Sequence, residues 1–373
     1  TITLPENYVV AATGNLMTPA ETSWLAQLAA QTKTKTTFES DNSFPESSSK
    51  LKTITYKQSK VHDFAWFADK RFHVLKGETK LAGSGKTIAT WAFFTNSEPQ
   101  LWMKSLDYIR DGLQYYSARI GDYPHASYTA IDGTSSAGEG MEYPMITIIG
   151  GSGDDFTLED VIVHEVGHSW FFDVLGFNER KEGWLDEGIN SYYELAYIRN
   201  KYPAEAEKGK HDLGEMGFVG KLTGINDLTM REAFRWMSLR QTLINEDQPI
   251  NTSSENFTRR NSGSIMYRRT ALAFEFLNDY LGESLFDSCM KKFYIDWQFR
   301  HPDGTDLRKT FEQVSGKDLS WFFDDIIGTT KPSKFRFKKV NYSGNNTTIT
   351  ISNTGKYNPP LKISGTINQT PFH

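Results

Sequence analysis

The strongest constraint on the fold of this chain is a pair of histidines four residues apart, followed at a distance by a glutamate. In the segment H-E-V-G-H at 164–168, both imidazoles project from one face of a helix and can reach one metal ion. Glu187 follows after eighteen intervening residues, enough to end one helix, turn, and start a second that runs back past the first. Two imidazoles and one carboxylate leave a fourth position open, as in catalytic zinc sites. The sequence therefore predicts one Zn²⁺ per chain, held by His164, His168 and Glu187.

Two further carboxylates belong to this hypothesis. Glu165 lies between the histidines and points beside the metal, where a general base can take a proton from the attacking water. Glu194 follows Glu187 by seven residues, so it shares that helix face and can accept the second ring N–H of a zinc histidine. The competing interpretations are two ordinary histidines on a helix and, for Glu194, a solvated or capping carboxylate.

The surrounding sequence predicts the two helices. Thr157 with an acid three residues later reads as a capping box, which predicts that the first helix begins there. The run 161–175 is mostly apolar and lacks proline, and Gly176 is a typical stop. The second helix is expected from about Trp184 to Asn200. Both helices are therefore expected to be buried in a large domain.

Size and charge exclude several classes of protein. The 373 residues suffice for two or three domains, and nine Trp and 25 Phe can fill a large core. The net charge of −5 shows no excess of basic residues of the kind that nucleic-acid-binding proteins have, so no nucleic-acid partner is expected. A single cysteine, Cys289, excludes an intrachain disulfide and a thiolate-rich metal site. No apolar run approaches the roughly 18 residues of a membrane span, so we expect a soluble domain. The composition fixes no compartment, and the periplasm and the cell surface both stay open.

The expected secondary structure changes twice along the chain. Residues 1–96 look mostly like strands, and a helical run follows at 98–120. Strands are expected near 127–131 and 145–149, ahead of the two metal-binding helices. Further helices are expected at 204–217, 229–245, 264–280, 284–299 and 306–314. After Pro332 the pattern returns to strands, at 335–340, 347–351 and 361–363.

Four segments give the chain a family resemblance. The first is the histidine–glutamate arrangement, with W-L-D-E-G at 184–188 close to a family W-L-N-E-G. The second is E-G-M-E-Y-P at 139–144, similar to a G-x-M-E-N motif. The third is Y-R-R-T at 267–270, at the place of Y-x-K-G, and the fourth is V-H-D-F-A-W at 61–66. Together they resemble the aminopeptidase N-type gluzincin zinc metallopeptidases, the family that also holds leukotriene hydrolase.

This resemblance implies an α+β multidomain fold. A thermolysin-like catalytic domain would occupy 97–330, flanked by β domains. Residues 1–96 would be the C-terminal part of an N-terminal β domain, and residues 331–373 the start of a C-terminal β-sandwich. The implied activity is that of a zinc aminopeptidase acting on peptides with a free N-terminus.

The resemblance also implies roles for the motif residues. Glu142 would bind the substrate α-amine, with Gly140 and Met141 beside it on the same strand, and Tyr267 would stabilise the oxyanion. In the second and third of these motifs, Glu139, Tyr143, Arg269 and Thr270 replace Gly, Asn, Lys and Gly. An endopeptidase or epoxide hydrolase on the same scaffold is one alternative. A non-catalytic peptide-binding scaffold is another, which the intact metal-binding residues argue against.

Overall fold

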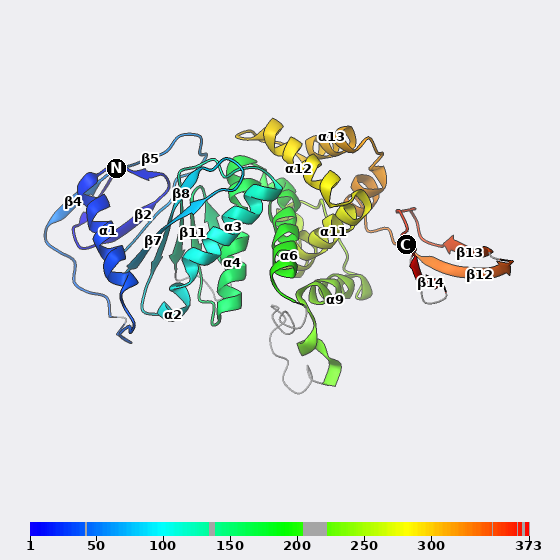
Figure 1. Ribbon diagram of the computed structural model, residues 1–373, viewed down its shortest axis with the longest axis horizontal. Coiled ribbons are helices and arrows are strands. Elements are labelled where there is room, and N and C mark those ends of the chain that lie inside the picture. Colours follow the sequence, from blue (N-terminus) through cyan, green and yellow to red (C-terminus); the bar gives the residue numbers. More distant parts are fainter. Residues whose placement is uncertain are drawn as a thin grey trace.

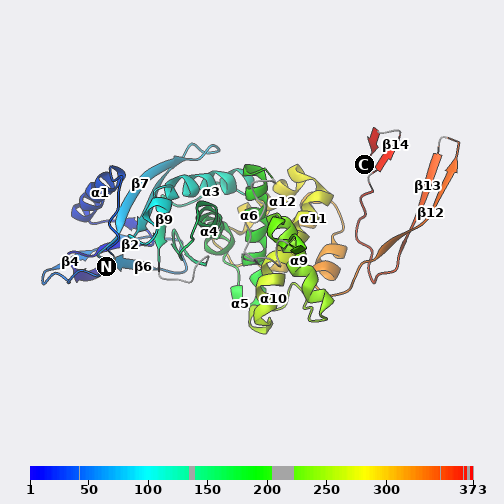
Figure 2. The same cartoon turned by 90° about the horizontal axis from the view of Figure 1, so that it is seen from below.

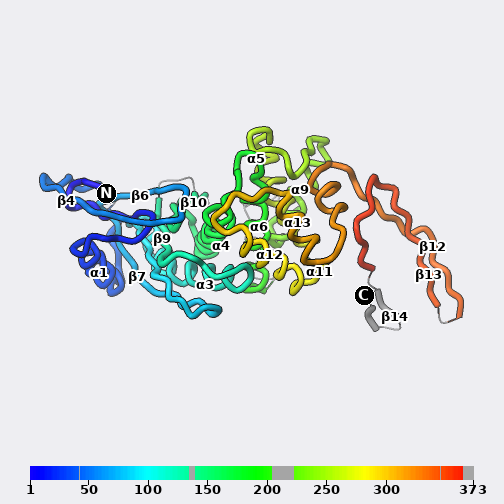
Figure 3. Tube along the Cα trace, turned by 90° about the horizontal axis from the view of Figure 1, so that it is seen from above, coloured from blue at the N-terminus to red at the C-terminus, as the bar shows by residue number. Residues whose placement is uncertain are grey.

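The computed structural model describes residues 1–41, 43–133, 139–203, 222–344, 346–363, 365–367 and 370–372. Figures 1, 2 and 3 show an elongated molecule with a strand-rich N-terminal part, a helical middle and β-hairpins at the C-terminal end. The α+β fold class is confirmed.

A mixed sheet of five strands lies at the centre of the N-terminal half. Its strands are β7 (His73–Lys80), β8 (Thr87–Phe94), β9 (Ser127–Asp132), β10 (Gly140–Tyr143) and β11 (Ile146–Ile149). Their order is β10-β11-β9-β8-β7, with parallel pairing in the middle and antiparallel pairing at both ends. Strand β10 therefore lies at an edge of this sheet.

The two faces of the sheet are covered by different helices, as the alternation of its side chains requires. On β8, Ala92 and Phe94 face the large core that contains α3 (Ser105–Arg119) and α4 (Asp155–Gly167). Phe93 faces the smaller core, which includes residues of α1 (Pro19–Lys33). Figure 1 shows α1 on one side of the sheet and α3 and α4 on the other.

The regular elements of residues 1–96 are mostly strands, as the sequence predicted, but they also include the helix α1, which was not expected. It begins with Pro19 at its first turn, where a missing N–H costs nothing. Leu25, Ala29 and Thr32 are buried at helical spacing. Around it lie short paired strands: β1 (Ile2–Pro5), β2 (Val9–Ala12), β3 (Asn15–Leu16), β4 (Leu51–Ile54), β5 (Tyr56–Lys57) and β6 (Trp66–Asp69).

The predicted ends of the first metal-binding helix are wrong by a few residues. Helix α4 begins at Asp155 because Asp154, not Thr157, is its N-cap: the Asp154 carboxylate accepts from the Thr157 N–H at 2.9 Å. The regular helix stops at Gly167, well before Gly176. A wider helical turn, η1 (Ser169–Val174), continues the chain.

The second metal-binding helix lies where it was expected. It opens with a wide turn, η2 (Trp184–Gly188), and continues as α6 (Ile189–Lys201). The remaining elements of the helical part are α2 (Pro99–Trp102), α5 (Glu179–Gly183), η3 (Ile225–Asp227), α9 (Met230–Leu243), η4 (Ser254–Asn256), α10 (Arg259–Asn261), η5 (Ser262–Arg269), α11 (Thr270–Leu281), α12 (Glu283–Trp297), α13 (Gly304–Ser315) and η6 (Trp321–Ile327). They confirm the helices expected after residue 229, whereas the helix expected at 204–217 lies outside the described residues.

The C-terminal end contains two hairpins. Strands β12 (Phe335–Ser343) and β13 (Asn346–Asn353) pair antiparallel, as do β14 (Gly365–Ile367) and β15 (Thr370–Phe372). The strand expected at 361–363 is absent from those residues, and the next strand begins at Gly365. Figures 1 and 2 show both hairpins projecting beyond the helical part.

Hydrogen bonding in the central sheet crosses residue 96. Strands β7 and β8 precede this residue, yet β8 pairs with β9 from Ala89 to Phe93. The sheet below the metal-binding helices therefore begins at His73. The sheet is thus built from residues on both sides of the expected domain boundary.

Candidate functional site

The helices that carry the metal-binding residues are locked together by one buried asparagine. The Asn190 amide donates to the His164 carbonyl oxygen at 2.8 Å, and its Oδ1 accepts from the Tyr116 hydroxyl at 3.1 Å. A Cβ on Gly167 would lie 1.9 Å from that Oδ1, so only glycine permits this approach. The backbone of α4 is therefore held against α6 by contacts that need no metal.

The three predicted ligand atoms lie close to one another. The Nε2 atoms of His164 and His168 lie 3.2 Å apart, and Glu187 Oε2 lies 3.1 Å from the first and 3.2 Å from the second. Ligand atoms 2.0–2.1 Å from a tetrahedral zinc are about 3.3–3.4 Å from one another. The three side chains therefore fit one zinc ion in spacing and in donor type.

The other ring nitrogen of each histidine contacts a carboxylate. His164 Nδ1 lies 2.6 Å from Glu194 Oε2, so Glu194 is where its sequence spacing put it. His168 Nδ1 lies 2.8 Å from Asp186 Oδ1, and both side chains are 1% exposed. The contact between Asp186 and His168 was not predicted from the sequence, because it depends on the wide turn η2, in which Asp186 lies. Each Nδ1–H donated to a carboxylate leaves Nε2 free for a metal.

The charges of this cluster depend on one another. Burial opposes a charged imidazole, but the surrounding carboxylates raise the pKa of both His164 and His168 well above the ordinary value. Burial alone would raise the pKa of Glu187, yet the two histidines hold it below its ordinary range. Without a metal, positive charge on the imidazoles balances the carboxylates. A divalent cation can replace those protons.

Glu165 lies beside the three ligand atoms and is 4% exposed. Burial raises its pKa to about 7, against the opposing effect of the two histidines. The Thr147 hydroxyl lies 3.3 Å from Glu165 Oε2 and donates to the Met141 carbonyl at 3.0 Å. A carboxyl with a pKa near neutrality suits a general base that must take and return a proton.

Gly140 gives Glu165 the room it occupies. A Cβ on Gly140 would lie 2.2 Å from Glu165 Oε1 and 2.5 Å from its carboxyl carbon. We expect Gly140→Ala to push the carboxylate aside and lower kcat by about 10²-fold, since a small displacement of a reacting group has this effect. Zinc content should stay at the wild-type level, because Gly140 is not one of the candidate ligands.

Steady-state kinetics together with metal analysis checks this expectation. Gly153→Ala is a suitable control for glycine replacement on a surface turn, since nothing lies within 4 Å of a Cβ there, although its positive φ strains the variant locally. Unchanged kcat in Gly140→Ala would mean that Glu165 has another productive position.

Glu142 and Met141 lie on the edge strand β10 next to the cluster. Glu142 is buried, and burial raises the pKa of its carboxyl. One of its oxygens lies within 4.8 Å of ligand atoms of His168 and Asp186. Met141, in contrast, is 39% exposed. Successive side chains of this strand thus point alternately toward the cluster and away from it.

Tyr267 lies in η5, beside the candidate metal ligand His164. Its ring stacks near the His164 ring, with centroids 6.3 Å apart and an interplanar angle of 20°. Burial and the neighbouring Glu187 carboxylate raise the pKa of the phenol well above its ordinary value, so it stays protonated. Gly188 allows this proximity, because a Cβ there would lie 2.6 Å from the Met266 carbonyl oxygen.

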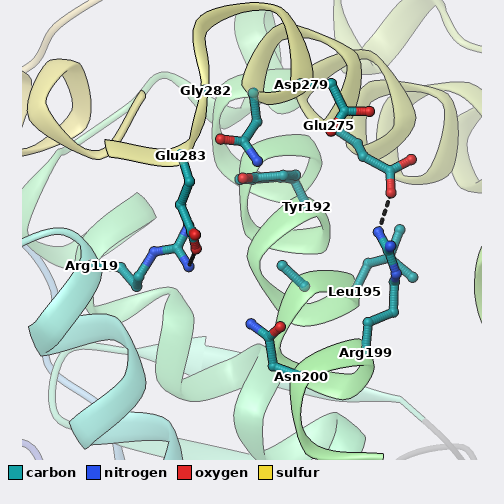
Figure 4. Close-up of a pocket in the computed structure, with 11 residues that line it drawn as sticks. Arg119, Tyr192, Leu195, Arg199, Asn200, Glu275, Asp279, Gly282 and Glu283 are labelled. Atoms are coloured by element: carbon teal, nitrogen blue, oxygen red, sulfur yellow. Dashed lines mark hydrogen bonds and ion pairs between the residues drawn. The ribbon is translucent and has the colours of Figure 1, made fainter. Parts of the chain in front are cut away.

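A separate pocket of about 390 Å³ lies on a different face of α6. Figure 4 shows its lining, in which Arg119 lies near Glu283 and Arg199 near Glu275. Both pairs are ion pairs. None of the residues that line this pocket belongs to the ligand cluster or to the predicted functional residues.

Comparison with known proteins agrees with this site. Residues 151–326 match the Peptidase family M1 domain, a range that includes both metal-binding helices and Tyr267. Aminopeptidase Q of Felis catus is 26% identical over 154 residues, 41% of this chain and 14% of the relative. Aminopeptidase N of Lactococcus lactis subsp. lactis is 24% identical over 164 residues, 44% of this chain and 18% of the relative. The matched segments thus cover less than a fifth of these relatives.

Solved structures support the fold. The M1 zinc metallopeptidase from Deinococcus radiodurans superposes with a TM-score of 0.59 at 17% identity, over 88% of this chain and 63% of that one. In the part of this chain that the structure describes, no helix has the length and apolar character needed to cross a membrane. The family match and the histidine–glutamate cluster that lies within it identify residues 151–326 as a peptidase family M1 domain of the aminopeptidase N-like zinc metallopeptidase type.

Proposed function

We propose that this protein is a zinc aminopeptidase that hydrolyses the first peptide bond of peptides with a free N-terminus. One observation carries this proposal: a buried carboxylate, Glu142, lies beside a cluster of ligand atoms spaced for one zinc ion. The relatives named aminopeptidases support it. A mutant of the Deinococcus enzyme has been solved with a bound Tyr-Ser-Ala substrate, which supports short peptides as the substrate class.

In the proposed mechanism the protein supplies a base, an acid and a hydrogen-bond donor. Zinc held by His164, His168 and Glu187 would polarise the scissile carbonyl and acidify water. Glu165 takes a proton from the attacking water and later returns one to the leaving amine. The Tyr267 hydroxyl donates to the oxygen that becomes negative during the attack.

Glu142 fixes which bond is cut. Its carboxylate would pair with the α-ammonium of the substrate, leaving room for only one residue before the reacting centre. Strand β10 lies at an edge of the central sheet and pairs on one side only among the described strands, so an extended substrate could align along its other side. Glu142, Gly140 and Met141 therefore form the proposed substrate-binding strand.

The amine requirement gives a direct test. We expect an N-acetylated peptide to be cleaved about 10²-fold less efficiently than the same peptide with a free N-terminus. Without the ammonium, Glu142 stays buried and unpaired, and removing one partner of a buried charge pair costs about 2–5 kcal/mol. The measurement is kcat/KM for both forms of one peptide, in wild type and in Glu142→Ala.

The variant should lose most of this discrimination, mainly through slower cleavage of the free form. Glu139→Ala is the matched control, since Glu139 is exposed and belongs to neither group of potential metal ligands among the described residues. Equal kcat/KM for the free and acetylated peptides would instead favour an endopeptidase on the same scaffold.

The role of Tyr267 predicts a different kinetic pattern. Tyr267→Phe should lower kcat by about 10²- to 10³-fold, the usual effect of losing one donor to an oxyanion. KM should change little, because this hydrogen bond forms only as the reaction proceeds. A loss found wholly in KM would assign Tyr267 to substrate binding.

We also propose that residues 97–330 act as the catalytic domain and that residues 331–373 begin a β-sandwich. All proposed catalytic, metal-binding and amine-binding residues fall in the first range. The paired strands β12 and β13 are what support the second.

A further inference from the structure

Tyr267 lies in a helical turn of unusual width. The segment η5 (Ser262–Arg269) is wound more loosely than a regular helix, and α11 continues it from Thr270. At their junction the Thr270 N–H donates to the Ile265 carbonyl oxygen, whereas a regular helix would use the N–H of residue 269 for this bond. The hydrogen bond thus spans five residues instead of four, and Tyr267 lies inside this wider turn.

The direction of the Tyr267 side chain depends on the width of the turn. Each residue of a regular helix rotates the chain by about 100°, so closing the turn to regular spacing would rotate the residues before it by about that angle relative to α11. The Tyr267 ring would then leave its place beside His164, where the two ring centroids are 6.3 Å apart. The turn has to stay wide for Tyr267 to remain at the candidate site.

Side chains hydrogen-bond to carbonyl oxygens of this turn. The Thr270 hydroxyl donates to the Ile265 carbonyl at 3.0 Å, the same oxygen that accepts from its own N–H. Nearby, Arg268 Nη1 donates to the Gly263 carbonyl at 2.7 Å. Both side-chain bonds span five residues. A threonine in a regular helix usually donates to the carbonyl four residues back, so the Thr270 bond fits the wide form of the turn.

Thr270 also packs against the turn that carries Glu187. A Cβ on Gly188 would lie 2.4 Å from Thr270 Cγ2, so the threonine methyl lies directly on the Gly188 backbone. Thr270 is completely buried between the two turns. The Y-x-K-G motif has a glycine at this position, which offers neither a hydroxyl nor a methyl group. This chain therefore has a side chain that bonds to the wide turn where the motif has none.

We propose that Thr270 is a positioning residue for Tyr267: its hydroxyl keeps η5 wide and so directs the Tyr267 phenol toward the reacting carbonyl of the substrate. The inference rests on the proposed function, because it takes Tyr267 as the hydrogen-bond donor to the oxyanion. Thr270 itself is buried and acts only through Tyr267.

The test uses two variants that separate the hydroxyl of Thr270 from its methyl group. Thr270→Val keeps the shape and loses the hydroxyl. We expect kcat for a free peptide to fall about 10-fold with KM nearly unchanged, since displacing a donor to the oxyanion acts on the transition state. Thr270→Ser keeps the hydroxyl and should keep kcat near the wild-type value. Zinc content should equal that of the wild type in both variants.

A double-mutant cycle with Tyr267→Phe shows whether Thr270 acts through the phenol. Once residue 267 has no hydroxyl, its direction no longer matters for the oxyanion. Thr270→Val should therefore cause no further loss of kcat in the Tyr267→Phe background. An equal fold-loss of kcat in both backgrounds would overturn the proposal, because Thr270 would then act on the reaction by another route.

Thr310→Val is the matched control. Thr310 is also buried, and its hydroxyl donates to the Asp306 carbonyl at 2.9 Å, four residues back in the regular helix α13. This variant should lower the melting temperature and keep the wild-type kcat. If Thr310→Val lowered kcat as much as Thr270→Val does, kcat would follow stability and the proposal would be overturned.

Three other results would also overturn it: wild-type kcat in Thr270→Val, a kcat in Thr270→Ser as low as in Thr270→Val, or loss of zinc from Thr270→Val. If Thr270→Val does not fold, Thr270→Ala takes its place with the same expectations, since it also lacks the hydroxyl but places no methyl group against the Ile265 carbonyl. A wild-type protein that cleaves no peptide would reject the proposed function itself, a distinct outcome.

Discussion

Replacing Glu165 by glutamine is expected to lower kcat by about 10²- to 10⁴-fold while the protein keeps its zinc. The amide is nearly isosteric but cannot accept the proton of the attacking water, and a well-placed general base contributes roughly this factor. Glu165 supplies none of the three converging ligand atoms, so metal content should not fall. Steady-state kinetics on a free peptide and elemental analysis of the same sample measure both quantities.

Glu159→Gln is the control for this variant. Glu159 is also a buried glutamate of α4, but it bonds to Tyr197, Tyr202 and Lys201, away from the ligand cluster. We expect this change to reduce stability and leave kcat near the wild-type value. If Glu165→Gln turned over as fast as Glu159→Gln, Glu165 would have no place in the mechanism.

Replacing His164 by alanine is expected to remove zinc and abolish activity. One of three ligand atoms is lost, and Glu187 and Glu194 lose the imidazole between them. The metal contributes several kcal/mol to the transition state, so kcat should fall at least about 10³-fold, at roughly 1.4 kcal/mol per factor of ten. Elemental analysis of protein purified without chelator should show zinc in the wild type and almost none in the variant.

His125→Ala provides the comparison. His125 is a buried histidine paired with Asp173, and it belongs to no group of potential metal ligands among the described residues. The His125→Ala variant should have a lower free energy of unfolding than the wild type but the same zinc content. Wild-type protein that neither contains zinc nor takes it up would contradict the metal assignment, whatever the variants show.

The clustering of the candidate metal ligands was predictable because their arrangement is mostly local. Four residues along a helix bring His164 and His168 to one face, and seven residues relate Glu187 to Glu194. Neither relation needs knowledge of distant contacts. The distances among their atoms are consistent with that reasoning. Their catalytic roles stay predictions until the variants are measured.

Asp186 could not be found in the same way. In a regular helix, neighbouring residues such as Asp186 and Glu187 point in directions about 100° apart, so Asp186 would not be expected at the same histidine as Glu187. In the structure, Asp186 lies in the wide turn η2, and its carboxylate contacts His168. Helix α1 was missed for a different reason. It carries many polar side chains, and only a narrow stripe that includes Leu25 and Ala29 is buried against the sheet. Both features depend on tertiary contacts that sequence periodicity does not report.

The Asn190 bridge between α4 and α6 has a consequence for how the free energy of metal binding is used. In many small zinc proteins the metal must gather its ligands from a disordered chain, so most of its binding energy goes into folding. Here the two helix backbones are already held together by the hydrogen bonds of Asn190 with His164 and Tyr116. This close approach is possible because Gly167 has no side chain. The conformational entropy that is lost when the ligands come together is therefore lost when the core folds, before any metal binds. Most of the zinc binding energy would then appear as affinity for the ion and not as folding free energy.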